Sequence, residues 1–219
     1  MDLNFSGVFE NISFILEGAS TTLTLITASI FFGTILGTLL ALMKLSKSIF
    51  LAAPATFYIS IFRGTPLVLQ LVLIYFGFPQ AFNIDLGIYG SAILSLSLNS
   101  GAYVAEIIRS GINAVDKGQT EAAEALGVSY GKMMKNIILP QAIKNILPAL
   151  INEFTALVKE SAVVTIIGAQ DIMRRTQIFG SQTFLYFESL LVAGAIYYII
   201  VTVISSIGRY VERRLAVSD

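Results

Sequence analysis

Residues 18–43 form an apolar run without a charged side chain, and the run is long enough to cross a lipid bilayer as a helix. The rest of the chain has the same character. Of its 219 residues, 55% are hydrophobic and only 13% are charged, and the mean hydropathy is +0.78. Soluble domains carry about 25% charged residues. The bilayer is therefore the expected solvent, and an all-α polytopic membrane protein is the predicted fold class.

The composition excludes several kinds of chemistry. The sequence has no cysteine and no histidine, which removes disulfides, thiol chemistry, thiolate or imidazole metal sites and a histidine general base. No metal or cofactor site is expected in this chain. The formal net charge is zero, which gives no indication of a nucleic-acid partner. Residues 1–4 lack a basic region, so no cleaved signal peptide is expected, and residues 1–17 are interpreted as a short interfacial helix.

The apolar runs predict one domain, residues 1–219, with five membrane spans. The spans are expected at about 18–43, 49–79, 88–112, 143–168 and 184–208. A turn is expected over residues 78–87 and a polar loop over residues 168–183. Gly33 and Gly37 have the GxxxG spacing that lets a second helix approach closely. Glycines scattered in a membrane helix explain the same pair equally well.

The second span is predicted to be a tilted, broken helix. At about 46 Å as a helix, residues 49–79 are too long for one straight crossing and too short for two. Arg63, Gly64, Thr65 and Pro66 interrupt the run, and Pro66 lacks the N–H that a continuous helix needs. Broken backbone inside a bilayer is tolerated only where it is buried in protein or lines a cavity.

Lysine and arginine set the expected orientation. With five spans, one side of the membrane carries Lys44, Lys47, Lys117, Lys132, Lys135, Lys144, Arg209, Arg213 and Arg214. Only Arg174 and Arg175 fall on the other side. The positive-inside rule places the first set in the cytoplasm. The N-terminus is then expected outside, and the C-terminus and the loop of residues 113–142 inside.

The longest polar stretch, residues 121–140, lies in that cytoplasmic loop. It begins with Glu-Ala-Ala-Glu-Ala-Leu-Gly at residues 121–127 and ends with Ile-Ile-Leu-Pro at residues 137–140. Its alanines favour a helix with Glu121 near the positive end, and Gly127 is able to end that helix. Ser129 is expected to cap a second helix over residues 130–138. An ordinary loop is the alternative, but loops of about 30 residues with this much helix are uncommon without a role.

The segment resembles the EAA motif of ABC-importer permeases, which reads Glu-Ala-Ala, three residues, Gly, nine residues, Ile-x-Leu-Pro. The matching residues are Glu121, Ala122, Ala123, Gly127, Ile137, Leu139 and Pro140. Residues 62–66, 99–103 and 105–106 resemble the polar amino-acid uptake subfamily, so the resemblance covers nearly the whole chain. It implies the type I ABC importer permease fold, in a subunit that forms a translocation pathway.

The resemblance also implies partners. The EAA segment would be a coupling helix that docks in a groove of a cytoplasmic ATPase subunit. The implied contact residues are Glu121, Ala122, Ala123, Glu124 and Gly127. A second permease chain, identical or different, an extracytoplasmic amino-acid-binding protein and a place in the prokaryotic cell (inner) membrane are implied as well.

ATP and magnesium are expected on the partner ATPase, because this chain has no P-loop. Its nearest match, residues 127–133, has three residues between the glycines where four are needed. Met133 stands where a serine or threonine would hold magnesium. The energy for transport must therefore come from another subunit.

Glu153, Lys159 and Glu160 fall within the predicted fourth span. Three charges facing lipid would cost on the order of 8–10 kcal/mol, at about 2.5–3.5 kcal/mol each, so they are expected to face the bundle interior or a wet cavity. Glu153 and Glu160 share a helix face, and Lys159 has neither at the spacing of an in-helix pair. Partners must come from another helix, another subunit or a ligand. An interhelical salt bridge and a substrate site are both open.

An amino acid fits such a site, because its ammonium group suits a glutamate and its carboxylate suits a lysine or an arginine. Two acids on one face leave room for a cationic side chain, so arginine, lysine or histidine is the favoured substrate and glutamine the main alternative. Further candidate substrate contacts are Asn99, Ser100, Tyr103, Arg63 and Gln70.

Four of these further candidates have a structural alternative. Asn99, Ser100 and Tyr103 are equally explained by interhelical hydrogen bonds, which are worth about 0.6 kcal/mol on average in membranes. Arg63 would meet either the substrate carboxylate or a loop carbonyl. Glu106 and Arg109, three residues apart, are interpreted as a structural ion pair.

Two other classes of protein compete with this interpretation. An ion-coupled secondary amino-acid transporter uses intramembrane acids as well, but has no use for an EAA segment. A membrane anchor for an enzyme complex would lack its usual haem and iron–sulfur ligands, since the chain has no His or Cys. The favoured prediction is a non-enzymatic permease subunit of an ATP-driven importer for polar, basic amino acids.

Overall fold

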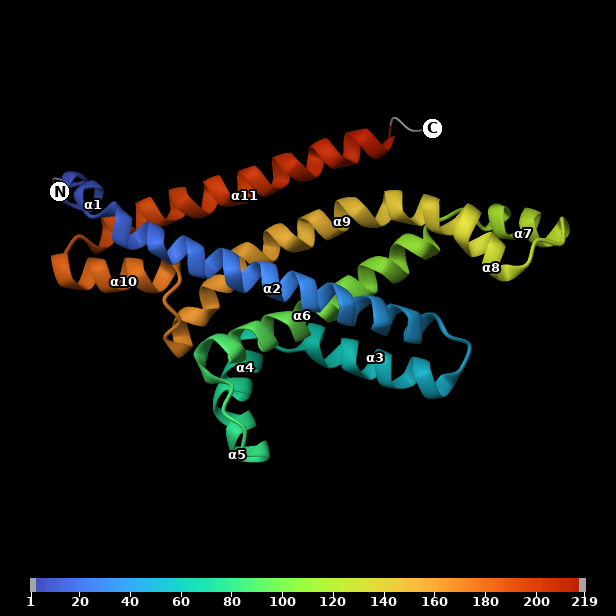
Figure 1. Ribbon diagram of the computed structural model, residues 1–219, viewed down its shortest axis with the longest axis horizontal. Coiled ribbons are helices and arrows are strands. Elements are labelled where there is room, and N and C mark those ends of the chain that lie inside the picture. The colour runs from blue at the N-terminus through green and yellow to red at the C-terminus, as the bar shows by residue number, and fades with distance from the viewer. Residues whose placement is uncertain (1–2, 217–219) are drawn as a thin grey trace.

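A computed structural model describes residues 3–216, which form helices joined by short turns (Figure 1). No strand occurs within this range. The α-helices are α1 (Ser6–Glu10), α2 (Ile12–Leu45), α3 (Ile49–Gly64), α4 (Leu67–Val72), α5 (Phe78–Phe82), α6 (Gly87–Asn113), α7 (Lys117–Ala125), α8 (Tyr130–Met133), α9 (Leu139–Glu160), α10 (Ile172–Thr183) and α11 (Tyr186–Ala216). Two π-helical turns, η1 (Leu73–Gly77) and η2 (Met134–Ile138), and one 3-10 helix, η3 (Ser161–Ile167), continue α4, α8 and α9.

The long helices run roughly along the long axis of the molecule, and α4 and α5 project from one side of the bundle (Figure 1). The N-terminal helix α1 and α10 lie at one end. Helices α7 and α8 lie at the other, towards which the α2–α3 turn and the C-terminal end of α11 also point. The segment of residues 121–140 is therefore separated from α1 and α10 by the full length of the helix bundle.

Three of the described helices are long and apolar enough to cross a membrane: α2, α6 and residues Tyr186–Arg214 of α11. A fourth crossing is formed if α3 and Leu67–Phe82, bent by 106° at their junction, are taken as one span. Helix α9 lies where the fourth span is predicted, but it carries four charged side chains and is not among these helices. The predicted count of five spans is thus not confirmed, because α9 is an amphipathic helix.

Three boundaries differ from the prediction. Helix α2 begins at Ile12 instead of residue 18, so the N-terminal helix is reduced to one turn and a half before Asn11. Helix α5 continues to Phe82, and the chain turns at Asn83 with a φ of 55°. The prediction of a polar loop over residues 168–183 is wrong, because residues 172–183 form α10. Asp171 caps that helix by accepting a hydrogen bond from the Arg174 N–H at 2.8 Å.

Helices α2 and α6 form the centre of the bundle, and two glycines of α2 allow their close contact. A Cβ atom at Gly37 would lie 2.6 Å from the Val104 side chain, and one at Gly33 would lie 3.2 Å from Ser100. The GxxxG interpretation of this pair is therefore confirmed, since larger side chains here would push α2 away from α6. The close contact fixes the position of α6, which carries most of the candidate site.

Candidate functional site

The segment of residues 121–140 forms an exposed two-helix element at one end of the molecule (Figure 1). Asp116 begins α7 by accepting a hydrogen bond from the Gly118 N–H at 2.6 Å. The helix ends at Gly127, whose φ of 68° favours glycine, and the Val128 N–H donates back to the Ala123 carbonyl at 3.0 Å. This closure turns the chain sharply into α8, and it leaves Leu126 82% exposed at the tip.

The predicted contact residues on α7 do not all face outward. Glu121, Ala122, Glu124 and Gly127 are exposed, whereas Ala123 is buried in an apolar cluster that holds α7 against the rest of the chain. The cluster consists of Val115, Ala123, Met133, Ile138, Ala142 and Ile146. Ala123 is therefore unable to touch a docked partner, and its role is to seat α7.

Three further expectations for this segment need correction. Glu121 lies in the middle of α7, because the helix begins at Lys117, four residues earlier than expected. Ser129 occupies the cap position of α8, but its side chain makes no capping hydrogen bond. The second helix is not regular either, since residues 134–138 form the π-helical turn η2 just before Pro140. π-helical turns are frequent at functional positions.

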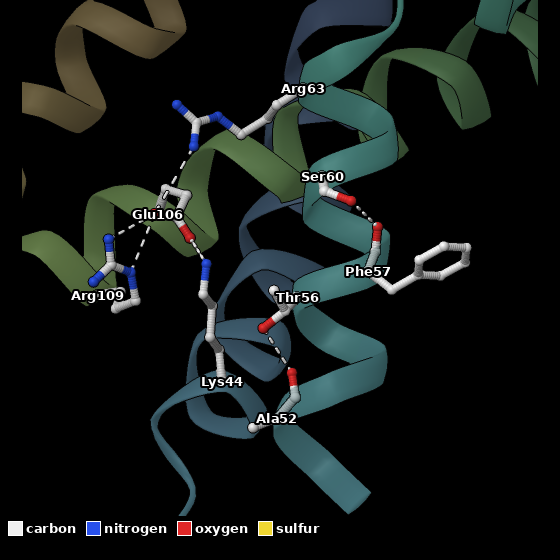
Figure 2. A network of polar contacts seen from close by, with 8 residues as sticks. All are labelled: Lys44, Ala52, Thr56, Phe57, Ser60, Arg63, Glu106 and Arg109. Carbon is white, nitrogen blue, oxygen red and sulfur yellow. Dashed lines mark hydrogen bonds and ion pairs between the residues drawn. The ribbon is translucent and has the colours of Figure 1, made fainter. Parts of the chain in front are cut away.

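A network of four charged side chains joins α2, α3 and α6 (Figure 2). Glu106 forms a salt bridge with Lys44 through one carboxylate oxygen and accepts hydrogen bonds from Arg109 at 2.9 and 3.1 Å through the other. Arg63 approaches this second oxygen to only 3.8 Å. The expected Glu106–Arg109 pair is thus confirmed, and Lys44, which stands 62 residues away in the sequence, is a partner that helical spacing alone does not reveal.

The break between α3 and α4 is held by a buried amide. The Gln70 side chain donates hydrogen bonds to the Phe62 carbonyl at 2.8 Å, the Thr65 carbonyl at 3.1 Å and the Thr65 hydroxyl at 3.0 Å. Its oxygen accepts from Asn99 at 3.1 Å. Gln70 and Asn99, which were predicted as substrate contacts, use hydrogen-bonding groups at the helix break, and their contact with a substrate stays a prediction.

Glu153 is half-buried on α9, where its carboxylate approaches Ser100 of α6. The Ser100 hydroxyl is fully buried and makes no hydrogen bond of normal geometry to any described residue. Lys159 and Glu160, by contrast, are exposed. Of the three charges expected to face the bundle interior, only Glu153 does so within this chain.

A cavity of about 400 Å³ lies between α6, α9 and the end of α3, which is in the size range of small-molecule sites. Its lining consists of Arg63, Tyr103, Glu106, Ile107, Ser110, Gly111, Ala114, Asn145 and Ala149. Asn145 donates a hydrogen bond to the Gly111 carbonyl at 3.5 Å, which fixes the antiparallel register of α6 and α9. In this register the α9 part of the lining ends at Ala149, one helical turn before Glu153.

The cavity unites two predicted site residues with one that was missed. Arg63 and Tyr103 both line it, and the Arg63 guanidinium lies over the Tyr103 ring at 5.3 Å from the ring centre. Asn145 escaped the sequence analysis, although it lies two helical turns before Glu153 on the same face of α9. A search for polar residues at that spacing would have found it.

Asp171 is a fully buried carboxyl group at the other end of the molecule. It accepts hydrogen bonds from the Thr165 hydroxyl at 2.8 Å and the Tyr197 hydroxyl at 3.3 Å, besides capping α10. Burial raises the pKa of this carboxyl above its ordinary value, although the hydrogen bonds oppose that shift. Asp171 thereby ties η3, α10 and α11 together.

A bundle of apolar helices with a charged cavity along its middle, and an exposed two-helix element at one end, defines the membrane subunit of a transporter. The family of binding-protein-dependent transport system inner membrane components matches residues 33–217, and the chain belongs to this family. The resemblance to ABC-importer permeases is thereby confirmed. The family also places the chain among multi-pass inner-membrane proteins.

Relatives and solved structures agree with this assignment. The arginine transport system permease protein of Bacillus subtilis is 53% identical over 219 residues, which is the whole of both chains. A glutamine transport system permease protein of Rickettsia bellii is 51% identical and covers 94% of this chain and 95% of its own. A crystal structure of an amino acid ABC transporter with histidines superposes with a TM-score of 0.92 at 42% identity, covering 98% of this chain and 100% of that one.

A methionine ABC transporter in an inward-facing conformation shares the fold alone. It superposes with a TM-score of 0.78 at 20% identity and covers 92% of this chain and 96% of its own. The predicted fold class, a permease of the ABC-importer type, is therefore confirmed. The chain is the permease subunit of an amino-acid ABC importer.

Proposed function

We propose that this importer carries basic amino acids, and that Glu153 is the residue that selects them. The observation that carries the proposal is the half-buried Glu153 carboxylate, which lies one helical turn beyond Ala149 in the lining of the 400 Å³ cavity and approaches the buried, unpaired Ser100 hydroxyl. A carboxylate in low-dielectric surroundings favours a cationic partner. The guanidinium, ammonium or imidazolium group of the substrate supplies that partner, and the Ser100 hydroxyl adds a hydrogen-bonding group.

The relatives support the same substrate class. The Bacillus subtilis relative, which matches this chain over its entire length, is named for arginine, and the solved amino-acid transporter contains histidines. Lys159 and Glu160 are exposed on the same helix as Glu153. They complete the polar path where a second permease chain, identical or different, packs against this one.

The energy for import comes from a separate cytoplasmic ATPase subunit that holds ATP and magnesium. Its docking site is the exposed surface of α7 and the turn that follows, with Glu121, Ala122, Glu124, Leu126 and Gly127 as contacts. Because η2 and Pro140 join this element directly to α9, a push on α7 moves the helix that carries Glu153. An extracytoplasmic amino-acid-binding protein delivers the substrate at the opposite end, near α1 and α10.

The distribution of positive charge supports one orientation. The end with α7, where most lysines and arginines gather, faces the cytoplasm together with the C-terminus, and the N-terminus lies outside. The protein then resides in the prokaryotic cell (inner) membrane as a multi-pass subunit.

Uptake competition tests the proposed substrate class. Cells or proteoliposomes that contain the importer take up labelled arginine in the presence of unlabelled arginine, lysine, histidine or glutamine. We expect the three basic amino acids to compete well and glutamine poorly. Glu153→Gln should weaken arginine uptake at least about tenfold more than glutamine uptake. Glu212→Gln, which changes a partly exposed carboxylate on α11, should change neither. Equal loss for arginine and glutamine in Glu153→Gln would overturn the basic-substrate assignment.

Glutamine is the second candidate substrate. The Rickettsia relatives named for glutamine are 47–51% identical to this chain, so the two substrate classes occur at similar sequence distance. Two results together would favour this second candidate: strong competition by glutamine in the same assay, and unchanged arginine uptake by the Glu153→Gln variant.

A further inference from the structure

Arg63 has more hydrogen-bonding capacity than its neighbours use. Its side chain is 43% exposed, and its guanidinium donates no hydrogen bond to any residue of the range 3–216. The nearest carboxylate oxygen, on Glu106, lies 3.8 Å away, beyond hydrogen-bond distance. A guanidinium carries five donors in a rigid fork, and here all five remain available.

Glu106 does not need Arg63 as its counter-ion. Lys44 already binds one of its oxygens, and Arg109 donates two hydrogen bonds to the other. Figure 2 shows Lys44 and Arg109 reaching Glu106 from two sides while Arg63 approaches from a third. Three cationic side chains thus face a single carboxylate, and Arg63 is the one whose charge is least compensated.

The least compensated of these charges, that of Arg63, faces the cavity. Arg63 lines the 400 Å³ space together with Tyr103, whose ring supports the guanidinium from one side. Arg109 does not line this cavity. Arg63 also lies close enough to Glu153 for the two charges to interact. Arg63 lines the cavity and Glu153 lies one helical turn beyond the lining residue Ala149, so a base and an acid lie near one end of the same cavity. This pair matches the two opposite charges of a free amino acid.

We propose that Arg63 is the receptor for the α-carboxylate of the transported amino acid, which thus lies with its carboxylate on the α3 side of the cavity and its cationic groups towards Glu153. The fork geometry of a guanidinium pairs with a carboxylate through two parallel hydrogen bonds. The site takes any amino acid with a free carboxylate, and it does not take the corresponding decarboxylated amine. This inference rests on the proposed function only in taking the ligand to be an amino acid.

The test compares each amino acid with its decarboxylated analogue. The permease, in complex with its ATPase subunit and reconstituted in nanodiscs without the binding protein, is titrated with arginine and agmatine and with glutamine and 4-aminobutanamide. The wild-type complex should bind each amino acid at least about tenfold more tightly than its analogue. Arg63→Gln should erase that preference, and Arg63→Lys, which keeps the charge but loses the fork, should retain part of it.

Arg213→Gln is the matched control, because it removes the same charge at an exposed position of α11 that does not line the cavity. It should leave the preference for the carboxylate within about twofold of wild type, a factor well below the tenfold step of one charge-assisted bond. Size-exclusion profiles show whether each variant folds. If Arg63→Gln does not fold, Arg63→Lys is compared with wild type in its place.

Several results would overturn the inference. One is a wild-type complex that binds amino acids and their decarboxylated analogues equally. Another is an Arg63→Gln variant that weakens both members of each pair alike. Failure of the proposed substrate class looks different, since glutamine would then bind more tightly than arginine while Arg63→Gln still erased the preference for the carboxylate.

Discussion

Replacing Gln70 by leucine tests whether one buried amide holds the break between α3 and α4. Gln70 makes four hydrogen bonds, three as donor to Phe62 and Thr65 and one as acceptor from Asn99. At about 0.6 kcal/mol for each bond within a membrane, their loss amounts to about 2.4 kcal/mol. Leucine has a similar size, so packing changes little, and the cost falls on the carbonyl groups that the break leaves without donors.

Thermal unfolding in nanodiscs measures this cost. For a chain of this size, about 2.4 kcal/mol corresponds to a fall in Tm of about 5–10 °C. Gln182→Leu is the control, because Gln182 is exposed at the end of α10 and makes no hydrogen bond with its side chain to another described residue. The control should shift the Tm by less than about 2 °C, since surface substitutions change stability by only about 0.5 kcal/mol.

A double-mutant cycle with Asn99→Leu separates the pair from the rest of the network. Asn99 and Gln70 should couple by about 0.6–1.7 kcal/mol, so the double variant should be less damaged than the sum of the single variants. A Gln70→Leu protein with the stability of wild type would refute the reasoning. The 106° bend would then be held by the neighbouring helices alone.

Three further predictions follow from single positions. Gly37→Ala should lower the Tm, because overpacking against Val104 costs about 1–3 kcal/mol. Gly194→Ala, whose added methyl group meets open space, should leave the Tm unchanged. Equal shifts in the two variants would refute the close contact between α2 and α6. The wild-type protein should lose stability as the pH rises from about 4 through the raised pKa of Asp171, because burial disfavours the charged form of this carboxyl. Thermal melts at a series of pH values measure this loss, and Asp171→Asn should abolish it. The same pH dependence in Asp171→Asn would contradict the prediction. Gly127→Asp should release the ATPase subunit during co-purification, because the turn at Gly127 has a positive φ. Gly131→Asp, which adds the same charge in open space on α8, should retain the subunit. Retention by both variants would refute the docking of the ATPase at this turn.

The sequence predicted the features that arise from local chemistry. Proline lacks a backbone N–H whatever its surroundings, so Pro66 predicts the break at residues 65–66 from the sequence alone. The turn at Gly127 is predicted in the same way, since the spacing of the EAA motif places a glycine where the backbone needs a positive φ. Helices α2 and α6 were predicted as membrane spans because each contains an uncharged run long enough to cross a bilayer.

Features that depend on contacts between distant segments could not be predicted. The partners of Gln70 and Glu106 come from other helices, and Lys44 reaches Glu106 across 62 positions of sequence. Helix α10 was mistaken for a loop because its polar sequence resembles one, whereas its helicity depends on the Asp171 cap and on packing against α2 and α11. The exposure of Lys159 and Glu160 was missed because helical spacing gives the face of a residue but not what covers that face.

ATP-driven import is the central claim, and transport by the reconstituted importer tests it most directly. Proteoliposomes that contain this permease with its ATPase subunit, and that are supplied with the binding protein, receive labelled arginine with or without ATP on the ATPase side. We predict uptake that requires hydrolysable ATP and continues when proton and sodium gradients are abolished. Uptake that continues without ATP and stops when an ion gradient is abolished would contradict the account and indicate an ion-coupled transporter.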